Sequence, residues 1–263
     1  MNTTTGTTPH PPRALVTGAG SGLGRAVAVG LAARGCTVVL VDIDELAVTE
    51  AALECRHHAR TVVQDLTAPG GPDLAVTLAA ATLGGLDIVV NNAGHGVAEP
   101  FLAMTEASWD RTLDLNLKAV ALICAAAGRV MRDQRTGGRI INVTSPASRM
   151  ALPNYAAYAA SKAGVDSVTR SAAVALAPFG VRVNSVAPGM MDTALQRDTE
   201  RQLAAIDHRA DLDAFRDERT RRIPIGRRSD CATVASMIVW LALDAPDDMT
   251  AERLNISGGL DKD

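Results

Sequence analysis

The chain has 263 residues, of which 47% are hydrophobic but only 3% aromatic, and its formal net charge is −3. This length suits one large domain, whose core must then be built mainly from alanine, valine, leucine and isoleucine. So small a net charge argues against nucleic acid or an anionic membrane surface as a partner.

The first twelve residues, "MNTTTGTTPHPP", lack both the basic and the apolar segments of a signal peptide. Their threonine, proline and glycine content predicts a disordered tail over residues 1–12. No apolar run reaches the length of a membrane span, so we expect a cytoplasmic protein. The four cysteines are scattered, which indicates small buried side chains in a reducing compartment and no metal site.

From Arg13 onward, short apolar runs alternate with longer stretches of helical pattern. Strands are predicted at residues 13–17, 37–41, 59–64, 86–94, 139–145, 181–189 and 252–257. Helices are predicted at residues 22–35, 44–58, 73–84, 105–134, 155–177 and 231–245. Strands of nearly continuous valine, isoleucine and leucine that alternate with helices are typical of a parallel sheet covered on both faces. Residues 13–263 are therefore predicted to form a single doubly wound α/β domain.

Residues 192–230 differ from the rest of the chain because they are rich in charge. Nine of these 39 residues are acidic and nine are basic. The segment is either a set of solvated helices or a mobile lid over an active site, and the pattern alone leaves both open.

A glycine-rich segment, "TGAGSGLG", joins the first strand to the first helix. Gly18, Gly22 and Gly24 allow a tight turn and a close approach of the backbone to a pyrophosphate. The helix N-terminus that follows offers unpaired N–H groups to the same phosphates. In this strand–turn–helix context the motif predicts a dinucleotide-binding site.

Asp42 ends the second predicted strand, 18 residues after Gly24. A carboxylate at this place can accept hydrogen bonds from the adenosine ribose hydroxyls and repels a 2′-phosphate. The alternative is a helix cap, since "DIDE" opens the next helix. Because Ser21, and no basic residue, occupies the middle of the glycine loop, the sequence favours NAD over NADP.

The segment "YAAYAASK" holds both tyrosines of the chain and one of only three lysines, in a chain with 23 arginines. Tyr158 and Lys162 are four residues apart on a predicted helix, so they share one face. A neighbouring ammonium lowers the pKa of a phenol toward the range that acid–base catalysis needs. Tyr155 has no such partner, because Ala159 stands four residues beyond it.

With "TGAGSGLG", then "NNAG" at residues 91–94 and then "YAASK", the chain resembles the classical short-chain dehydrogenase/reductase family from about Arg13 to Leu260. The resemblance implies a Rossmann-type sheet of seven parallel strands, a helical substrate lid at about residues 192–222, and a homo-oligomer, either a tetramer or a dimer. It also implies hydride transfer with a nicotinamide cofactor, here NAD, and a small-molecule substrate.

Four residues match the family's catalytic positions. The resemblance implies that Tyr158 is the acid/base and that Lys162 lowers its pKa and binds the cofactor ribose. It implies that Ser145 hydrogen-bonds the substrate oxygen and that Asn116 kinks its helix and holds a proton-relay water.

The resemblance also implies the residues around the cofactor, with Asp65 beside the adenine and the segment "NSVAPGMMDT" around the nicotinamide. The expected cofactor-binding residues are Gly18, Ser21, Gly22, Leu23, Gly24, Asp42, Asp65, Leu66, Asn92, Ala93, Gly94, Tyr158, Lys162, Pro188, Gly189, Met191 and Thr193. Beside the matched motifs, the expected substrate-pocket residues are His95, Ser145, Ala147, Tyr155 and Met190. Whether His95 binds a substrate hydroxyl or faces solvent is open.

These residues predict an NAD-dependent oxidoreductase that interconverts a secondary alcohol and a ketone. The substrates that we expect are a sugar, a cyclitol or a specialised-metabolite ring. Alternatives are an NADPH-dependent 3-oxoacyl thioester reductase, a non-redox activity such as dehydration, and a non-catalytic nucleotide sensor. Asp42 argues against the first of these, and the intact set of Asn116, Ser145, Tyr158 and Lys162 argues against the last.

Overall fold

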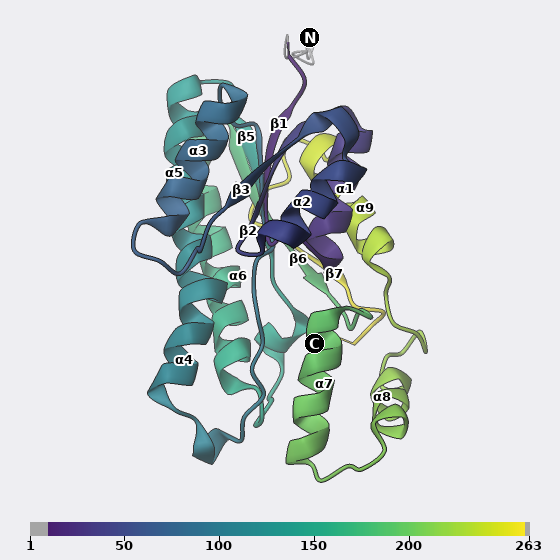
Figure 1. The fold of residues 1–263 in the computed structure, drawn as a ribbon. Coiled ribbons are helices and arrows are strands. Elements are labelled where there is room, and N and C mark those ends of the chain that lie inside the picture. The colour runs from purple at the N-terminus through teal and green to yellow at the C-terminus, as the bar shows by residue number, and fades with distance from the viewer. Residues whose placement is uncertain (1–9, 261–263) are drawn as a thin grey trace.

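A parallel sheet of seven strands forms the centre of the molecule (Figure 1), in a computed structural model that describes residues 10–260. The strand order is β3-β2-β1-β4-β5-β6-β7, and every pair of neighbours is parallel. The strands are β1 (Arg13–Thr17), β2 (Thr37–Asp42), β3 (Ala59–Val63), β4 (Ile88–Asn91), β5 (Gly138–Val143), β6 (Val181–Pro188) and β7 (Arg253–Ile256). The predicted α/β class and the predicted strands are confirmed, whereas most of the predicted tail, residues 1–9, lies outside the described residues.

Helices cover both faces of the sheet, as the nearly continuous apolar strands predict. The α-helices are α1 (Gly22–Ala33), α2 (Glu45–Glu54), α3 (Gly71–Leu83), α4 (Glu106–Leu113), α5 (Ala119–Gln134), α6 (Ala156–Leu176), α7 (Ala194–Ile206), α8 (Leu212–Arg221) and α9 (Cys231–Leu243). Short 3₁₀ helices lie at Arg56–His58, Phe101–Ala103, Pro146–Arg149 and Ala177–Phe179. Within residues 10–260, no helix is both long and apolar enough to cross a membrane.

Two hydrophobic cores, one on each face, hold these layers together. Successive residues of a strand point to opposite faces. In β2, Val38 and Leu40 accordingly pack with α1, α2 and α9, whereas Val39 and Val41 pack with α3, α5 and α6. Small aliphatic side chains fill both cores, which explains how a chain so poor in aromatic residues buries this sheet.

The long helix predicted for residues 105–134 is interrupted. Its middle, Asp114–Lys118, is a π-helix between α4 and α5. A π-helical turn inside an α-helix is a common mark of a functional site, and the completely buried Asn116 lies within this one.

The strand order reverses direction between β1 and β4, which places a crevice at the carboxyl ends of these strands. Ligands of open α/β sheets bind in such a crevice. The carboxyl ends point toward the half of the molecule that holds α7 and α8 (Figure 1). We call α7, α8 and the residues between them, 194–221, the α7–α8 hairpin.

Candidate active site

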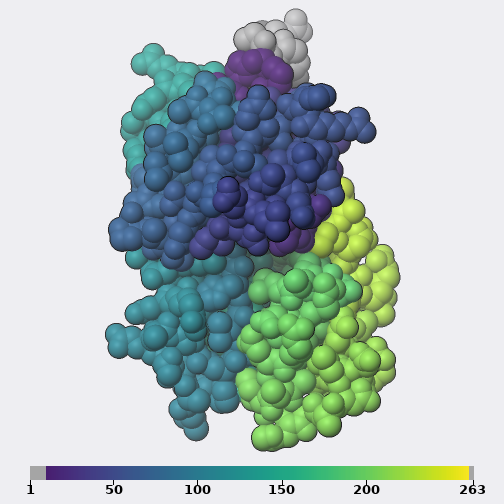
Figure 2. Space-filling model, viewed as in Figure 1, coloured from purple at the N-terminus to yellow at the C-terminus, as the bar shows by residue number. Residues whose placement is uncertain are grey.

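A cleft of about 1010 Å³ opens along the carboxyl ends of the strands. It runs between the loops that follow β1 to β6 and the α7–α8 hairpin, which borders the N-terminal half of the chain in the space-filling view (Figure 2). All of the cofactor, catalytic and substrate residues expected from the sequence line this cleft except Gly24 and Asn116. Residues from motifs far apart in the chain are therefore brought to one place.

The glycine loop after β1 is shaped by close backbone contacts. Gly18 has a φ of +61°, and a Cβ atom there would lie 2.8 Å from the Cα of Ala93. A Cβ atom on Gly24 would lie 2.1 Å from the carbonyl oxygen of Gly18. Gly24 is thus required for packing beneath the loop, which explains why it does not line the cleft. Ser21, Gly22 and Leu23 do line it, so the N-terminal end of α1 faces the cleft and can bind phosphate.

Asp42 lies at the end of β2 and faces the same loop. Its Oδ2 accepts a hydrogen bond of 2.8 Å from the backbone N–H of Gly20, and its Oδ1 accepts one of 3.1 Å from Asp44. The N-cap of α2 is Asp44, whose carboxylate accepts from Ala47. The alternative interpretation of Asp42 as the helix cap is therefore wrong, and its carboxylate is held at the cleft wall.

Asp65 stabilises the turn after β3. One carboxylate oxygen accepts hydrogen bonds of 2.6 Å from the side chain of Thr67 and 2.8 Å from its backbone. These bonds hold the pKa of Asp65 below its usual value, so the residue is a carboxylate at the edge of the cleft.

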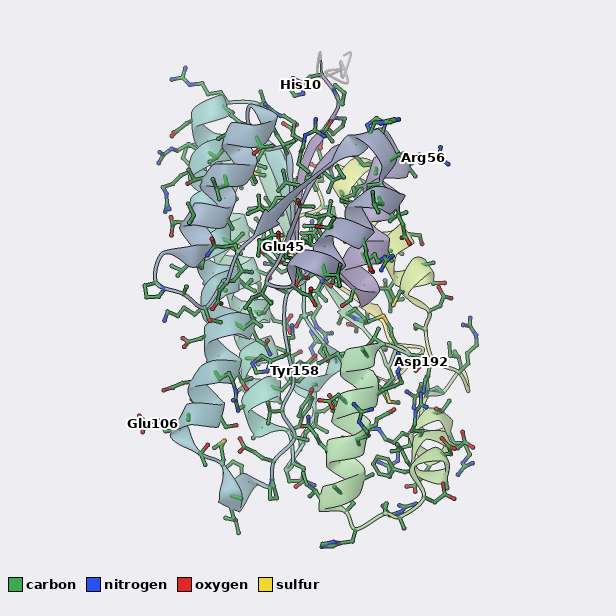
Figure 3. The ribbon with its side chains drawn as sticks, viewed as in Figure 1. His10, Glu45, Arg56, Glu106, Tyr158 and Asp192 are labelled. Carbon is green, nitrogen blue, oxygen red and sulfur yellow. The ribbon has the colours of Figure 1, made fainter. Side chains whose placement is uncertain are left out.

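Tyr158 and Lys162 lie one turn apart on α6, and Ser145 is the N-cap of the 3₁₀ helix Pro146–Arg149, which follows β5. Tyr158 lies between the helices of the α4–α6 side and α7 (Figure 3). Burial raises the pKa of Tyr158, and a hydrogen bond between its hydroxyl and that of Ser145 lowers it, with burial the stronger effect. In the protein alone, the phenol is therefore neutral near pH 7.

Lys162 is only 5% exposed, and its Nζ donates a hydrogen bond of 2.9 Å to the carbonyl oxygen of Val143. The same Nζ lies 5.6 Å from the centre of the Tyr158 ring. The pKa of Tyr158 in the protein alone is set by burial and by Ser145, and the lowering of this pKa by Lys162 stays a prediction. Burial also lowers the pKa of Lys162 to about 8, against a smaller opposing effect from the charge of Asp166.

This low pKa predicts how stability depends on pH. Between the folded pKa of about 8 and the usual lysine value of 10.5, the unfolded chain binds a proton that the folded chain does not. The contribution of Lys162 to the free energy of unfolding should therefore rise with pH across this window. We expect the wild type to gain stability relative to Lys162→Met as the pH rises from 8 to 10.5, measured by urea unfolding of both proteins. A constant difference between the two proteins would show that Lys162 is not desolvated in this way.

Asn116 holds the backbone at one wall of the cleft. Its Oδ1 accepts a hydrogen bond of 2.9 Å from the N–H of His95, and its Nδ2 donates one of 2.8 Å to the carbonyl oxygen of the same residue. The predicted kink of its helix is present as the π-helix. Because Asn116 is completely buried, its side chain positions residue 95 and does not itself line the cleft.

His95 and Tyr155 form part of the substrate side of the cleft. The Nε2 atom of His95 lies 3.0 Å from the carbonyl oxygen of Arg111, which leaves Nδ1 for any substrate hydroxyl. The ring of Tyr155 stacks on that of Tyr158 with centroids 4.3 Å apart, and its hydroxyl lies 3.5 Å from Oγ1 of Thr199. Tyr155 therefore joins the catalytic helix α6 to α7.

The hairpin supplies lining residues that the motifs do not reveal. On α7 these are Ala194, Leu195, Gln196, Thr199 and Leu203, and on α8 it is Arg219. Three of them, Gln196, Thr199 and Leu203, have the spacing i, i+3, i+7 of one helix face, which could have indicated them. The hairpin thus forms part of the cleft wall, and its action as a lid stays a prediction. Among residues 10–260, no three histidine, cysteine or acidic side chains are grouped to hold a metal ion.

A comparison with known protein families matches residues 12–204 to the short chain dehydrogenases. The chain belongs to this family. It is an oxidoreductase of the short-chain dehydrogenase/reductase type that acts on CH–OH groups, and the family binds a nicotinamide cofactor.

Two relatives and one solved structure cover nearly the whole short-chain dehydrogenase. The chain is 40% identical to the cis-4-hydroxycyclohexanecarboxylate dehydrogenase of Sinomonas cyclohexanicum over 94% of its own length and 95% of the relative's. It is 34% identical to the galactitol 2-dehydrogenase of Agrobacterium fabrum over 94% and 96% of the two chains. The crystal structure of an NAD⁺-bound xylitol dehydrogenase superimposes with a TM-score of 0.90 at 29% identity, covering 95% and 99% of the two chains. These relatives are dehydrogenases of secondary alcohols.

Proposed function

We propose that this short-chain dehydrogenase uses NAD to interconvert a secondary alcohol and a ketone, with Tyr158 as the acid/base. The observation that carries the proposal is the hydrogen-bonded pair of Ser145 and Tyr158 on the wall of the same cleft as the glycine loop. The cofactor supplies the acceptor or donor of the hydride. The close contacts at Gly18 and Gly24 leave no room for a side chain at these two positions, which fits a close approach of the backbone to a pyrophosphate.

The residues of the chain supply proton transfer and orientation. In alcohol oxidation, Tyr158 accepts the hydroxyl proton of the substrate, and in ketone reduction it returns that proton to the oxygen. Ser145 and Tyr158 together stabilise the charge that develops on this oxygen. Lys162, held by Val143, places a positive charge beside the phenol and is positioned to bind a cofactor hydroxyl.

The preference for NAD rests on Asp42. Its carboxylate, fixed at the cleft wall by Gly20 and Asp44, can accept hydrogen bonds from a ribose and would repel a 2′-phosphate. We expect the wild type to bind NADH at least about tenfold more tightly than NADPH, since hydrogen bonds to a charged group contribute about 1.5–3 kcal/mol. In Asp42→Ala, the two affinities should fall within about threefold of each other, as the same contribution is lost.

The test is a fluorescence titration of the wild type and two variants with NADH and NADPH. Asp44→Ala is the matched control, because it removes a carboxylate two residues away that does not line the cleft. A wild type that prefers NADPH would contradict the role of Asp42 and favour reduction of a 3-oxoacyl thioester. Binding of neither nucleotide would favour a non-catalytic role for the fold.

We also propose a class of substrate and an oligomeric state for this protein. The cleft combines the hydroxyls of Tyr155 and Thr199 with the thioethers of Met190 and Met191, which suits a moderately polar ring or polyol. The named substrates of the relatives, a polyol and a hydroxylated ring, are of this kind. Formation of NADH in equal amount to the product would exclude dehydration. A cytoplasmic homotetramer or homodimer is the form that we expect.

A further inference from the structure

Arg219 places a positive charge in the wall of the cleft on the substrate side. It lies on α8, its side chain is 25% exposed, and one of its terminal nitrogens lies 3.7 Å from the sulfur of Met190. Its guanidinium lies 5.7 Å from the centre of the ring of Phe215, which is only 5% exposed. The charge is thus held on a helix in a fixed place.

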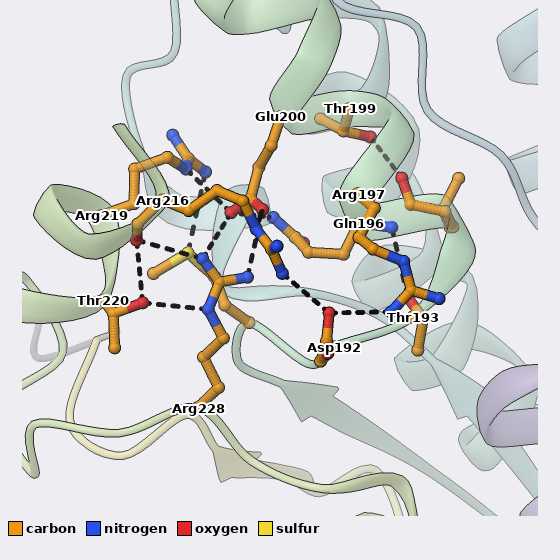
Figure 4. Close-up of polar contacts among 12 residues, drawn as sticks. Asp192, Thr193, Gln196, Arg197, Thr199, Glu200, Arg216, Arg219, Thr220 and Arg228 are labelled. Carbon is orange, nitrogen blue, oxygen red and sulfur yellow. Dashed lines mark hydrogen bonds and ion pairs between the residues drawn. The ribbon is translucent and has the colours of Figure 1, made fainter. Parts of the chain in front are cut away.

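The carboxylate nearest to Arg219, that of Glu200, already accepts hydrogen bonds from other side chains (Figure 4). Glu200 is completely buried and accepts hydrogen bonds of 2.8 and 3.2 Å from Arg228, 3.1 Å from Arg216 and 3.1 Å from Gln196. Arg219 reaches it only through Nε, at the longer distance of 3.4 Å. Arg219 is therefore the least satisfied of the three arginines around this carboxylate.

The charged side chains around Asp192 and Glu200 also include more positive than negative groups. Asp192 pairs with Arg197 and Arg216, and Glu200 pairs with Arg216, Arg219 and Arg228. Four guanidinium groups thus share two carboxylates. Among the residues that the structure describes, the terminal nitrogens of Arg219 have no oxygen acceptor, and their one hydrogen-bond partner is the weakly accepting sulfur of Met190.

Withdrawing a guanidinium from water without a full counter-charge is costly, and burial lowers the pKa of Arg219 accordingly. A bound anion would offset this cost. A carboxylate matches the two terminal nitrogens of one arginine in geometry and charge.

The place of Arg219 relative to the catalytic residues sets the geometry of such a substrate. Arg219 and Tyr155 line the same cleft, and so does Met190, whose sulfur lies 3.7 Å from a terminal nitrogen of Arg219. Tyr155 in turn stacks on Tyr158. A molecule whose hydroxyl meets Tyr158 would therefore lie in the same cleft as Arg219, which its other end can face.

We propose that Arg219 binds a carboxylate of the substrate, so that the enzyme acts on a secondary alcohol that carries a carboxylate at the end remote from the reacting carbon. This inference rests on the proposed function, because it takes Tyr158 as the reacting end of the cleft. It assigns Arg219 as the residue that selects acidic over neutral alcohols.

The test compares two ligands of the same shape, cyclohexanecarboxylate and cyclohexanecarboxamide, by calorimetric titration of the protein saturated with NADH. We expect the wild type to bind the carboxylate at least about tenfold more tightly than the amide, as for a charge-assisted hydrogen-bonded pair. Arg219→Gln should bind the two ligands about equally. Arg201→Gln, the control, removes an exposed charge on α7 that pairs with Asp198 and does not line the cleft, and it should keep the preference.

Equal binding of the two ligands by the wild type, binding of neither, or a preference that survives in Arg219→Gln would overturn the assignment. The NADH titration separates this failure from that of the proposed function. A protein that binds NADH but does not prefer the carboxylate loses only the role of Arg219. Thermal unfolding of Arg219→Gln checks that its fold is intact, which we expect because Arg216 and Arg228 still neutralise Glu200.

Discussion

Replacing Tyr158 by phenylalanine should lower kcat by about a thousandfold, because general acid–base catalysis contributes about 10²–10⁴. The ring and its stacking on Tyr155 are kept, so only the hydroxyl that faces Ser145 is lost. The measurement is turnover of a secondary alcohol that the wild type oxidises, from a panel of polyols and hydroxylated rings, together with the affinity for NADH. We expect that affinity to change by less than about threefold, since no charge-assisted hydrogen bond is removed.

Tyr155→Phe is the matched control for this experiment. It also removes a phenolic hydroxyl, from the tyrosine three residues earlier in the chain. This hydroxyl lies 3.5 Å from Oγ1 of Thr199. A hydrogen bond this long contributes little, so we expect kcat to fall by less than about tenfold, the factor for about 1.4 kcal/mol. Comparable losses in the two variants would mean that the hydroxyl of Tyr158 has no special role as the acid/base.

Replacing Glu200 by glutamine should destabilise the α7–α8 hairpin by about 3–5 kcal/mol, the usual cost of breaking a buried ion pair from one side. The change leaves Arg216, Arg219 and Arg228 around an uncharged amide. Urea unfolding and hydrogen exchange of the backbone amides of residues 194–221 measure the effect. If only the hairpin opens, the amides of β1 to β6 should keep their protection.

The control for this change is Glu218→Gln on the same hairpin. Glu218 also pairs with two arginines, Arg209 and Arg222, but its side chain is 37% exposed. Exposed pairs contribute about 0–1 kcal/mol, so this variant should be nearly as stable as the wild type. Equal effects of the two substitutions would show that the buried cluster does not hold the hairpin in place.

The stability of the wild type should also depend on pH through Glu200. Burial alone would raise the pKa of Glu200, but the hydrogen bonds from Arg228 and Gln196 and the nearby positive charges lower it overall. A carboxylate with a lowered pKa contributes stability that is present above its unfolded pKa and is lost as the pH falls through the folded value. The advantage of the wild type over Glu200→Gln should therefore shrink in acid.

Local patterns carried most of the fold and the cofactor half of the site. The first two apolar strands, the loop with Gly18 and Gly24, and the position of Asp42 at the end of β2 all lie within residues 13–42. Each depends on a short-range requirement, such as a positive φ or room for a backbone approach, and can be recognised from adjacent letters. The spacing of Tyr158 and Lys162 on one helix is local in the same sense.

The tertiary structure decided the burial, the hydrogen-bond partners and the pKa values of these residues. The pKa of Tyr158 follows from how deeply it is buried, and Lys162 is held by a strand carbonyl that lies 19 residues before it, so the expected lowering could not be checked from spacing alone. In the same way, residues 192–230 read only as mixed charge, yet folding places Glu200 in the interior and Arg219 at the cleft. Burial and pairing between distant segments change electrostatic energies more than residue type does. The sequence by itself therefore determined the family and the chemistry that its residues can perform, and only the tertiary structure decided which charges remain available to a substrate.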